Sequence, residues 1–160
     1  MKVLMPGSYD PCTVGHLAVI RAAAERFREV TVAVFINPKK EGLFSYAERV
    51  EFLRLATADL PRVTVAFSDG MVADFAKDGG YDLIVKGIRN EEDRRYETEM
   101  ATYNLERGGV PTELMPARDG MCEVSSTAVR EALARGEALR GLVPEAARAA
   151  ILTAYAKGHS

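Results

Sequence analysis

Residues 2–16 read KVLMPGSYDPCTVGH, a short apolar run followed by a turn rich in glycine, proline and hydroxyl side chains. The run Val3-Leu4-Met5 is typical of a buried strand, and a helical pattern begins after the turn. The stretch therefore predicts a β-strand that enters a helix through a compact turn. The N–H groups and the dipole at the start of such a helix favour a bound anion.

The same alternation of strand and helix continues along the chain. Nearly continuous apolar runs, typical of strands buried on both faces, occupy residues 2–5, 30–36, 63–67, 82–86 and 112–115. Helical patterns cover residues 14–28, a segment after Ser45, and residues 71–78, 91–107, 126–135 and 144–157. The order predicts an α/β fold: a Rossmann-like, doubly wound, five-stranded parallel sheet in a single domain, residues 1–160. Ligands of such sheets bind at the carboxyl ends of the strands.

Local signals mark individual helices. Ser45 and Glu48 have the spacing of a capping box, so a helix is expected to begin after Ser45. In residues 91–107, Tyr96, Met100 and Tyr103 fall on one face, and Gly108-Gly109 ends the pattern. In the last helix the shared face carries Ala147, Ile151, Ala154 and Tyr155.

Composition excludes several classes of protein. The net charge of −2 argues against a nucleic-acid binder that depends on a broad basic surface. The chain has two cysteines, Cys12 and Cys122, which favours a reducing, cytoplasmic location over a disulfide framework. No apolar run approaches the length of a membrane span, so no membrane partner is expected.

The first turn lacks both common phosphate-binding fingerprints, which argues against a P-loop kinase and a dinucleotide dehydrogenase. Gly7, Ser8, Gly15 and His16 still suit a phosphate group. Alternatively, the glycines only permit the turn and His16 is a capping or core residue. Cys12 and His16 could also form a nucleophilic pair, but the sequence shows neither an orienting third group nor a third ligand at zinc spacing, so no metal site is expected.

Three further loops after predicted strands carry cations or hydroxyls. Asn37-Pro38-Lys39-Lys40 is either a solvated basic turn or an anion site. In Lys86-Gly87-Ile88-Arg89 a lysine ends an apolar run, and a buried cation needs a partner, for which a ligand phosphate is a candidate. In residues 123–127 the hydroxyls exceed what one helix cap needs, which suits a triphosphate.

Together these loops resemble the nucleotidyltransferase superfamily with its T/H-x-G-H signature, and within it the bacterial phosphopantetheine adenylyltransferases. The resemblance rests on Gly7–Pro11 with Thr13–His16, on Pro38-Lys39-Lys40, Lys86–Arg89 and Tyr96-Glu97, and on Val124–Thr127 and Leu142-Val143-Pro144. It covers the whole chain. The first motif alone would equally fit enzymes that use nicotinamide mononucleotide or glycerol 3-phosphate.

The resemblance implies reversible adenylyl transfer from ATP to 4'-phosphopantetheine with Mg²⁺, giving 3'-dephospho-CoA and pyrophosphate in coenzyme A biosynthesis, by a homohexamer. Catalytic roles fall on His16, Lys40 and Arg89. Phosphopantetheine would contact Ser8, Lys40, Val72 and Lys86. ATP would contact Ser8, Tyr9, His16, Gly87, Ile88, Arg89, Glu97, Val124, Ser125, Ser126 and Thr127. A non-catalytic nucleotide-binding module on the same fold is the rival from another class.

The chain departs from the family pattern at several positions. Lys86 stands where an arginine is usual, which keeps the charge but loses the bidentate geometry. Arg94 and Arg95 replace a phenylalanine and a glutamate, and Cys122 replaces an aromatic residue. None of these changes removes a residue that the expected chemistry requires.

Overall fold

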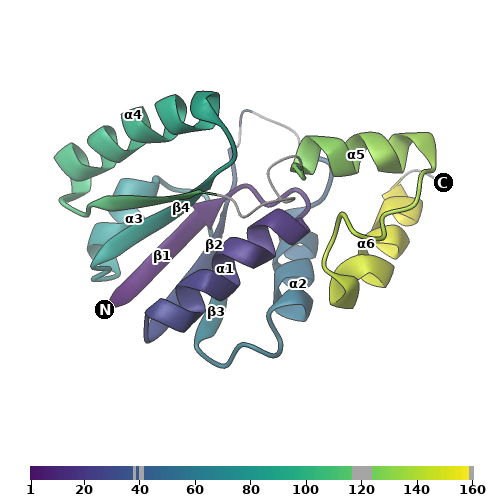
Figure 1. The fold of residues 1–160 in the computed structure, drawn as a ribbon, viewed down its shortest axis with the longest axis horizontal. Helices are drawn as coiled ribbons and strands as arrows, with labels where there is room; N and C mark the ends of the chain where they lie inside the picture. The colour runs from purple at the N-terminus through teal and green to yellow at the C-terminus, as the bar shows by residue number, and fades with distance from the viewer. Residues whose placement is uncertain (38, 40–41, 117–123, 159–160) are drawn as a thin grey trace.

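Five parallel strands form one sheet in the order β3-β2-β1-β4-β5 (Figure 1). The computed structural model describes residues 1–37, 39, 42–116 and 124–158. The strands are β1 (Lys2–Gly7), β2 (Glu29–Phe35), β3 (Val63–Ser68), β4 (Leu83–Ile88) and β5 (Thr112–Pro116). Every pairing is parallel, and Val3 of β1 aligns with Val30 of β2 and Leu83 of β4. The predicted Rossmann-like, doubly wound sheet is confirmed.

Helices cover both faces of the sheet. They are α1 (Val14–Arg26), α2 (Tyr46–Ala56), α3 (Val72–Asp78), α4 (Glu91–Gly108), α5 (Ser126–Arg135) and α6 (Glu145–Gly158). Helices α1 and α2 lie on one face and α3 and α4 on the other, while α5 and α6 lie beyond the carboxyl ends of the strands (Figure 1). The arrangement follows from right-handed crossovers on either side of β1, where the strand order reverses.

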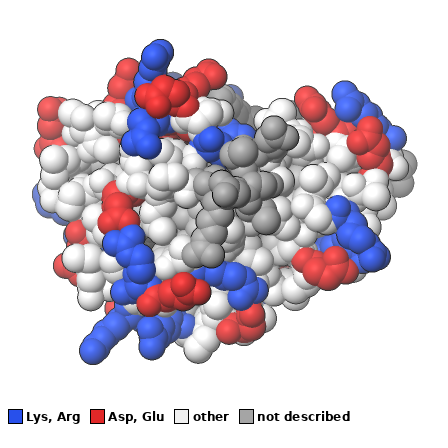
Figure 2. Space-filling model, in the orientation of Figure 1, with Lys and Arg blue, Asp and Glu red and all other residues white. Residues whose placement is uncertain are grey.

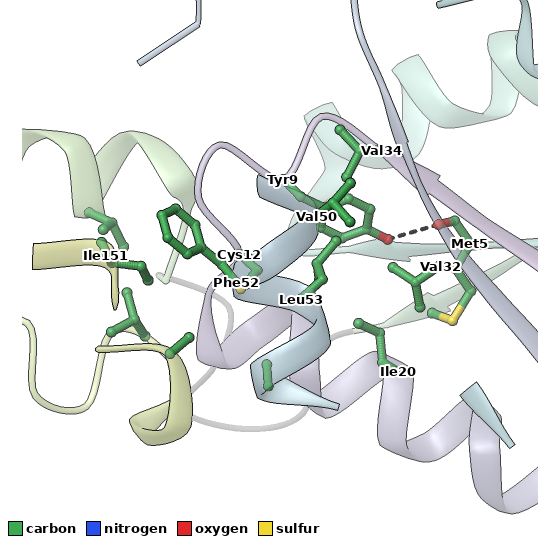
Figure 3. Close-up of a cluster of buried hydrophobic side chains, with 14 of the residues drawn as sticks. Met5, Tyr9, Cys12, Ile20, Val32, Val34, Val50, Phe52, Leu53 and Ile151 are labelled. Carbon is green, nitrogen blue, oxygen red and sulfur yellow. Dashed lines mark hydrogen bonds between the residues drawn. The ribbon is translucent and has the colours of Figure 1, made fainter. Parts of the chain in front are cut away.

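The larger apolar core lies between the sheet, α1, α2 and α6. Phe52 and Leu53 of α2 and Ile151 of α6 are buried there together with Cys12 (Figure 3). A smaller cluster on the opposite face joins Leu4, Ala33, Ala76, Ile84 and Val110. Burial on both faces explains the continuous apolar runs of β1, β2 and β4. The edge strands β3 and β5 are only partly buried, so the expectation of full burial is wrong for them.

Local signals predicted the helix ends well. Ser45 and Glu48 form the predicted reciprocal capping box, and Gly109 ends α4 in the left-handed conformation at φ 76°. The shared face of Tyr96, Met100 and Tyr103 does not join the core: Tyr96 is 61% exposed and Tyr103 41%. Asn104 is the buried residue of this helix.

Charges of both signs are interspersed on the face shown in Figure 2, and no part of the described surface there is uniformly basic. Among the described residues, no helix is both long and apolar enough to cross a bilayer.

Candidate active site

A cavity of about 340 Å³ opens at the carboxyl ends of β1 and β4, where the strand order switches. Its walls come from the turn after β1, the loop after β4 and the first turns of α1, α4 and α5. All of the residues predicted to contact ATP line it: Ser8, Tyr9, His16, Gly87, Ile88, Arg89, Glu97, Val124, Ser125, Ser126 and Thr127. Lys86 lines it as well.

His16 is fixed in one orientation by a reciprocal cap at the start of α1. The Thr13 hydroxyl accepts a hydrogen bond from the His16 N–H, and the Thr13 N–H donates to Nδ1 of His16 at 3.0 Å. Because Nδ1 accepts, the proton of the neutral imidazole lies on Nε2, which is then a donor. The capping and phosphate-binding interpretations of His16 are therefore compatible.

The environment of His16 keeps the imidazole neutral. Burial lowers the pKa of His16 to about 4, assisted by the positive charges of Lys86 and Arg89. The Tyr9 ring packs edge-on against the imidazole, with 4.8 Å between ring centroids. A neutral Nε2–H donor next to two cations suits an anionic oxygen of a ligand.

We expect this pKa shift to make the folded protein less stable in acid. Between pH 4 and the ordinary value of 6.5 the unfolded state binds more protons at His16, so the free energy of unfolding rises with pH. The stability that comes from keeping His16 neutral is fully present above pH 6.5 and is lost as the pH falls towards 4. Compared with His16→Asn, the wild type should lose on the order of 2–3 kcal/mol over this range. Urea unfolding of both proteins at several pH values measures the difference, and parallel pH curves would contradict it.

Tyr9 shapes the turn after β1 from inside the protein. Its backbone is left-handed at φ 45°, it is 6% exposed, and its hydroxyl donates to the Met5 carbonyl oxygen (Figure 3). Burial raises the pKa of this phenol well above its usual range. A Cβ on Gly7 would come within 2.9 Å of the Tyr9 ring, so Gly7 is required by Tyr9.

Lys86 in β4 and Arg89 directly after it are paired with carboxylates of α4. Lys86 Nζ donates to the Pro6 carbonyl oxygen at 3.0 Å and lies 3.5 Å from Glu97. Arg89 makes two side-chain hydrogen bonds to Asp93, with Nε at 2.9 Å. The sequence indicated that Lys86 needs a partner for its charge, and Glu97 supplies one within the protein. Both carboxylates, Asp93 and Glu97, also line the cavity.

The hydroxyls before α5 have protein partners. Ser125 caps the helix by accepting from the Ala128 N–H, as one hydroxyl was expected to do. Ser126 donates to the Pro11 carbonyl oxygen at 2.8 Å, and Thr127 accepts from Arg130. The Ser126 bond joins the start of α5 to the turn after β1, and both segments line the cavity.

The nucleophile interpretation of Cys12 is not supported. Cys12 is 1% exposed in the apolar core, and burial raises the pKa of its thiol to about 12. It is therefore a thiol at neutral pH and packs as a small apolar side chain. Nor do three or more His, Cys, Asp or Glu side chains gather as a possible metal-ligand set within the part of the chain that the structure describes.

Comparison with known proteins shows the family to which the chain belongs. Residues 4–132 match the family described as cytidylyltransferase-like. The phosphopantetheine adenylyltransferase of Symbiobacterium thermophilum is 45% identical, with 90% of each chain covered. That of Corynebacterium glutamicum is 38% identical over 99% of this chain and 100% of the relative. The chain belongs to the phosphopantetheine adenylyltransferase family. The predicted resemblance and the predicted nucleotidyltransferase class are confirmed.

Within this adenylyltransferase fold, the predicted acceptor residue Val72 does not line the cavity. Val72 begins α3 and packs against the smaller apolar cluster. Lys40 lies outside the described residues, as do Pro38 and Cys122. The acceptor roles of Lys40 and Val72 stay predictions.

Sequence reasoning missed two charged residues that line the adenylyltransferase cavity, Asp93 and Arg130. Arg130 donates from Nη1 to the Asp10 carbonyl oxygen at 2.9 Å and from Nη2 to the Thr127 hydroxyl. The sequence signal for Arg130 was its position about one turn after the serine-rich N-cap. Helical side chains point back toward the N-terminus, so a residue at this position reaches the cap.

Proposed function

We propose that this protein transfers the adenylyl group of ATP to 4'-phosphopantetheine, giving 3'-dephospho-CoA and pyrophosphate in coenzyme A biosynthesis. The observation that carries the proposal is the cavity in which a neutral, Nδ1-anchored His16 lies beside Lys86 and Arg89. The names of the relatives support the choice of acceptor.

The acceptor phosphate carries out the attack without help from a general base. With a second pKa near 6, a phosphate monoester is largely a dianion at neutral pH. One of its oxygens forms a bond to the α-phosphorus of ATP, while the bond from that phosphorus to the α,β-bridging oxygen breaks. Pyrophosphate leaves with the electron pair. The protein therefore contributes positioning and charge stabilisation.

Each cation and donor has a place in this scheme. Nε2 of His16 donates to an α-phosphate oxygen as charge builds there, and Arg89 with the start of α5 holds the departing phosphates. Lys86, Ser8 and, by family resemblance, Lys40 hold the attacking phosphate. Nε and Nη2 of Arg89 are bonded to Asp93, so phosphate binding through these two nitrogens exchanges the carboxylate for phosphate oxygens.

Magnesium enters as part of the nucleotide substrate. Mg²⁺ prefers oxygen ligands and is commonly held by substrate phosphates with one or two carboxylates. Asp93 and Glu97 are the carboxylates described in the cavity wall, and each is paired with a cation. This donor set fits a Mg²⁺ bound mainly through ATP oxygens, with Asp93 available once Arg89 turns to phosphate.

Pyrophosphate release from Mg²⁺-ATP tests the proposal. It is measured with 4'-phosphopantetheine, nicotinamide mononucleotide and glycerol 3-phosphate as separate acceptors. We expect release with 4'-phosphopantetheine alone. Release with another acceptor would keep the chemistry but overturn the acceptor, and ATP binding without release in all three assays would favour a non-catalytic nucleotide-binding module.

Replacing Asp93 with asparagine should tighten ATP binding. The change removes a negative charge from the cavity and weakens the hold on Arg89, while a side-chain oxygen remains to accept a hydrogen bond. We expect the Kd for Mg²⁺-ATP, measured calorimetrically, to fall by about threefold to tenfold. Asp74→Asn is the matched control, because it changes a similar ion pair with Arg107 away from the cavity. A weaker binding of ATP by Asp93→Asn would show that this carboxylate assists binding, for example through the metal.

The family resemblance also leads us to propose a homohexamer and a cytoplasmic location. Exposed apolar side chains on one face of α4 and before α3 support self-association, since exposed apolar surface commonly marks an interface: Met71, Tyr96 and Tyr103. Light scattering after size-exclusion chromatography measures the assembly, and a monomer at micromolar concentration would overturn it.

A further inference from the structure

Asp10 and Arg49 form a buried ion pair behind the cavity wall. Each residue is 7% exposed, and Nε of Arg49 lies 3.3 Å from Oδ1 of Asp10. Neither side chain lines the cavity. Burying two opposite charges is costly unless further hydrogen bonds compensate for the lost hydration, so the remaining contacts of the pair are informative.

The Asp10 carboxylate accepts backbone hydrogen bonds from the segment Gly42–Phe44, which leads into α2. Its Oδ2 accepts from the Leu43 N–H at 2.8 Å, and its Oδ1 accepts from the Phe44 N–H at 2.9 Å. This segment follows Lys40, the predicted acceptor lysine, in the sequence. Asp10 itself belongs to the turn that carries Ser8, so one carboxylate joins two loops.

Arg49 completes the connection from α2. Its Nε donates to the Phe44 carbonyl oxygen at 2.8 Å, and Nη1 donates to the Ser8 carbonyl oxygen at 3.3 Å. A Cβ on Gly42 would lie 1.7 Å from Nη2 of Arg49 and 2.8 Å from Oδ2 of Asp10. Glycine at position 42 therefore leaves the space that the guanidinium fills.

We infer that Asp10 and Arg49 are positioning residues for the acceptor: they set the place of Ser8 relative to the segment Gly42–Phe44, which follows Lys40 in the sequence. The inference rests on the proposed function. His16 is held by its reciprocal cap with Thr13, which involves neither Asp10 nor Arg49. Loss of the pair should accordingly disturb the acceptor more than ATP.

The test uses Arg49→Lys, which keeps the charge but loses the planar fork, and Asp10→Asn, which keeps one acceptor oxygen. Arg107→Lys is the control, because it makes the same replacement in the exposed pair with Asp74. Three quantities are measured for each folded variant: amide hydrogen exchange at Leu43 and Phe44, the KM for 4'-phosphopantetheine, and the Kd for Mg²⁺-ATP without acceptor.

We expect exchange at both amides to be at least about tenfold faster, because their acceptor carboxylate is no longer held. The acceptor KM should rise about tenfold or more, while the Kd for ATP changes by less than about threefold. The control should match the wild type in all three quantities. If Asp10→Asn does not fold, Arg49→Lys alone decides.

Two results would overturn the inference: unchanged exchange at Leu43 and Phe44, or faster exchange with an unchanged acceptor KM, which would leave a structural role only. An equal loss for ATP and acceptor would also contradict it. Failure of the proposed function is seen separately, in a wild-type protein that releases no pyrophosphate with 4'-phosphopantetheine, and the inference would fail with it.

Discussion

Replacing His16 with alanine is expected to lower kcat/KM for adenylyl transfer by about 100-fold or more, which corresponds to about 3 kcal/mol of transition-state stabilisation. The variant loses the Nε2–H donor that the Thr13 N–H fixes in place. It loses no positive charge, because the imidazole is neutral at the pH of the assay. The effect should therefore fall mainly on kcat, with a smaller change in the Kd for ATP.

Steady-state kinetics of pyrophosphate release measures this effect, with ATP titrated calorimetrically against the same preparation. The control is His159→Ala, which removes the other histidine of the chain. His16→Asn adds a graded test, because its amide can donate a hydrogen bond but has a shorter reach. A kcat for His16→Ala near that of the wild type would remove His16 from the proposed mechanism.

Replacing Phe52 with alanine is expected to lower the free energy of unfolding by about 3–5 kcal/mol. Phe52 is 2% exposed, and its ring packs edge-on against Phe44 with 5.1 Å between centroids. It lies between α2 and the α6 residues around Ile151 (Figure 3), so no surface group can close the resulting space. The midpoint of thermal unfolding should fall by roughly 10 °C in a chain of this size.

Chemical denaturation with urea measures the stability of Phe52→Ala. Leu152→Ala is the matched control on α6: Leu152 is 42% exposed, and its loss should change stability by no more than about 0.5 kcal/mol. Equal stability losses in the two variants would show that the interior between α2 and α6 rearranges to fill the cavity.

The elements of the fold that depend on local sequence were predictable. The apolar runs predicted each strand to within a few residues, although burial on both faces explains the runs only in β1, β2 and β4. Ser45 with Glu48 marked a helix start through contacts three residues apart. The face of α4 was harder to interpret. Tyr96 and Tyr103 have core-like spacing, but periodicity does not distinguish a face that packs inside one chain from one left at the surface.

The candidate site was predictable where the chain order places loops at one edge of the sheet. With the family motifs, that argument predicted a set of ATP contacts, including Arg89 and Ser125, and all of these residues line one cavity. It could not find Asp10 paired with Arg49, since a charged residue in a helix usually faces solvent and only the fold brings these two positions together. The neutral state of His16 likewise depends on the fold, which buries the imidazole and brings Lys86 and Arg89 near it.

The wall contributed by α5 has a consequence for how the protein acquires its activity during synthesis. Ser8, His16 and Lys86 all precede α5 in the chain, whereas Ser125, Ser126 and Arg130 arrive with α5 and its N-cap. Chains emerge from the ribosome N-terminus first, so the sheet can assemble before the cavity has its final wall. While α5 is still inside the ribosome, the turn after β1 lacks the hydrogen bond that Ser126 donates to the Pro11 carbonyl oxygen. Onset of catalysis during translation is therefore expected only after α5 has left the ribosome.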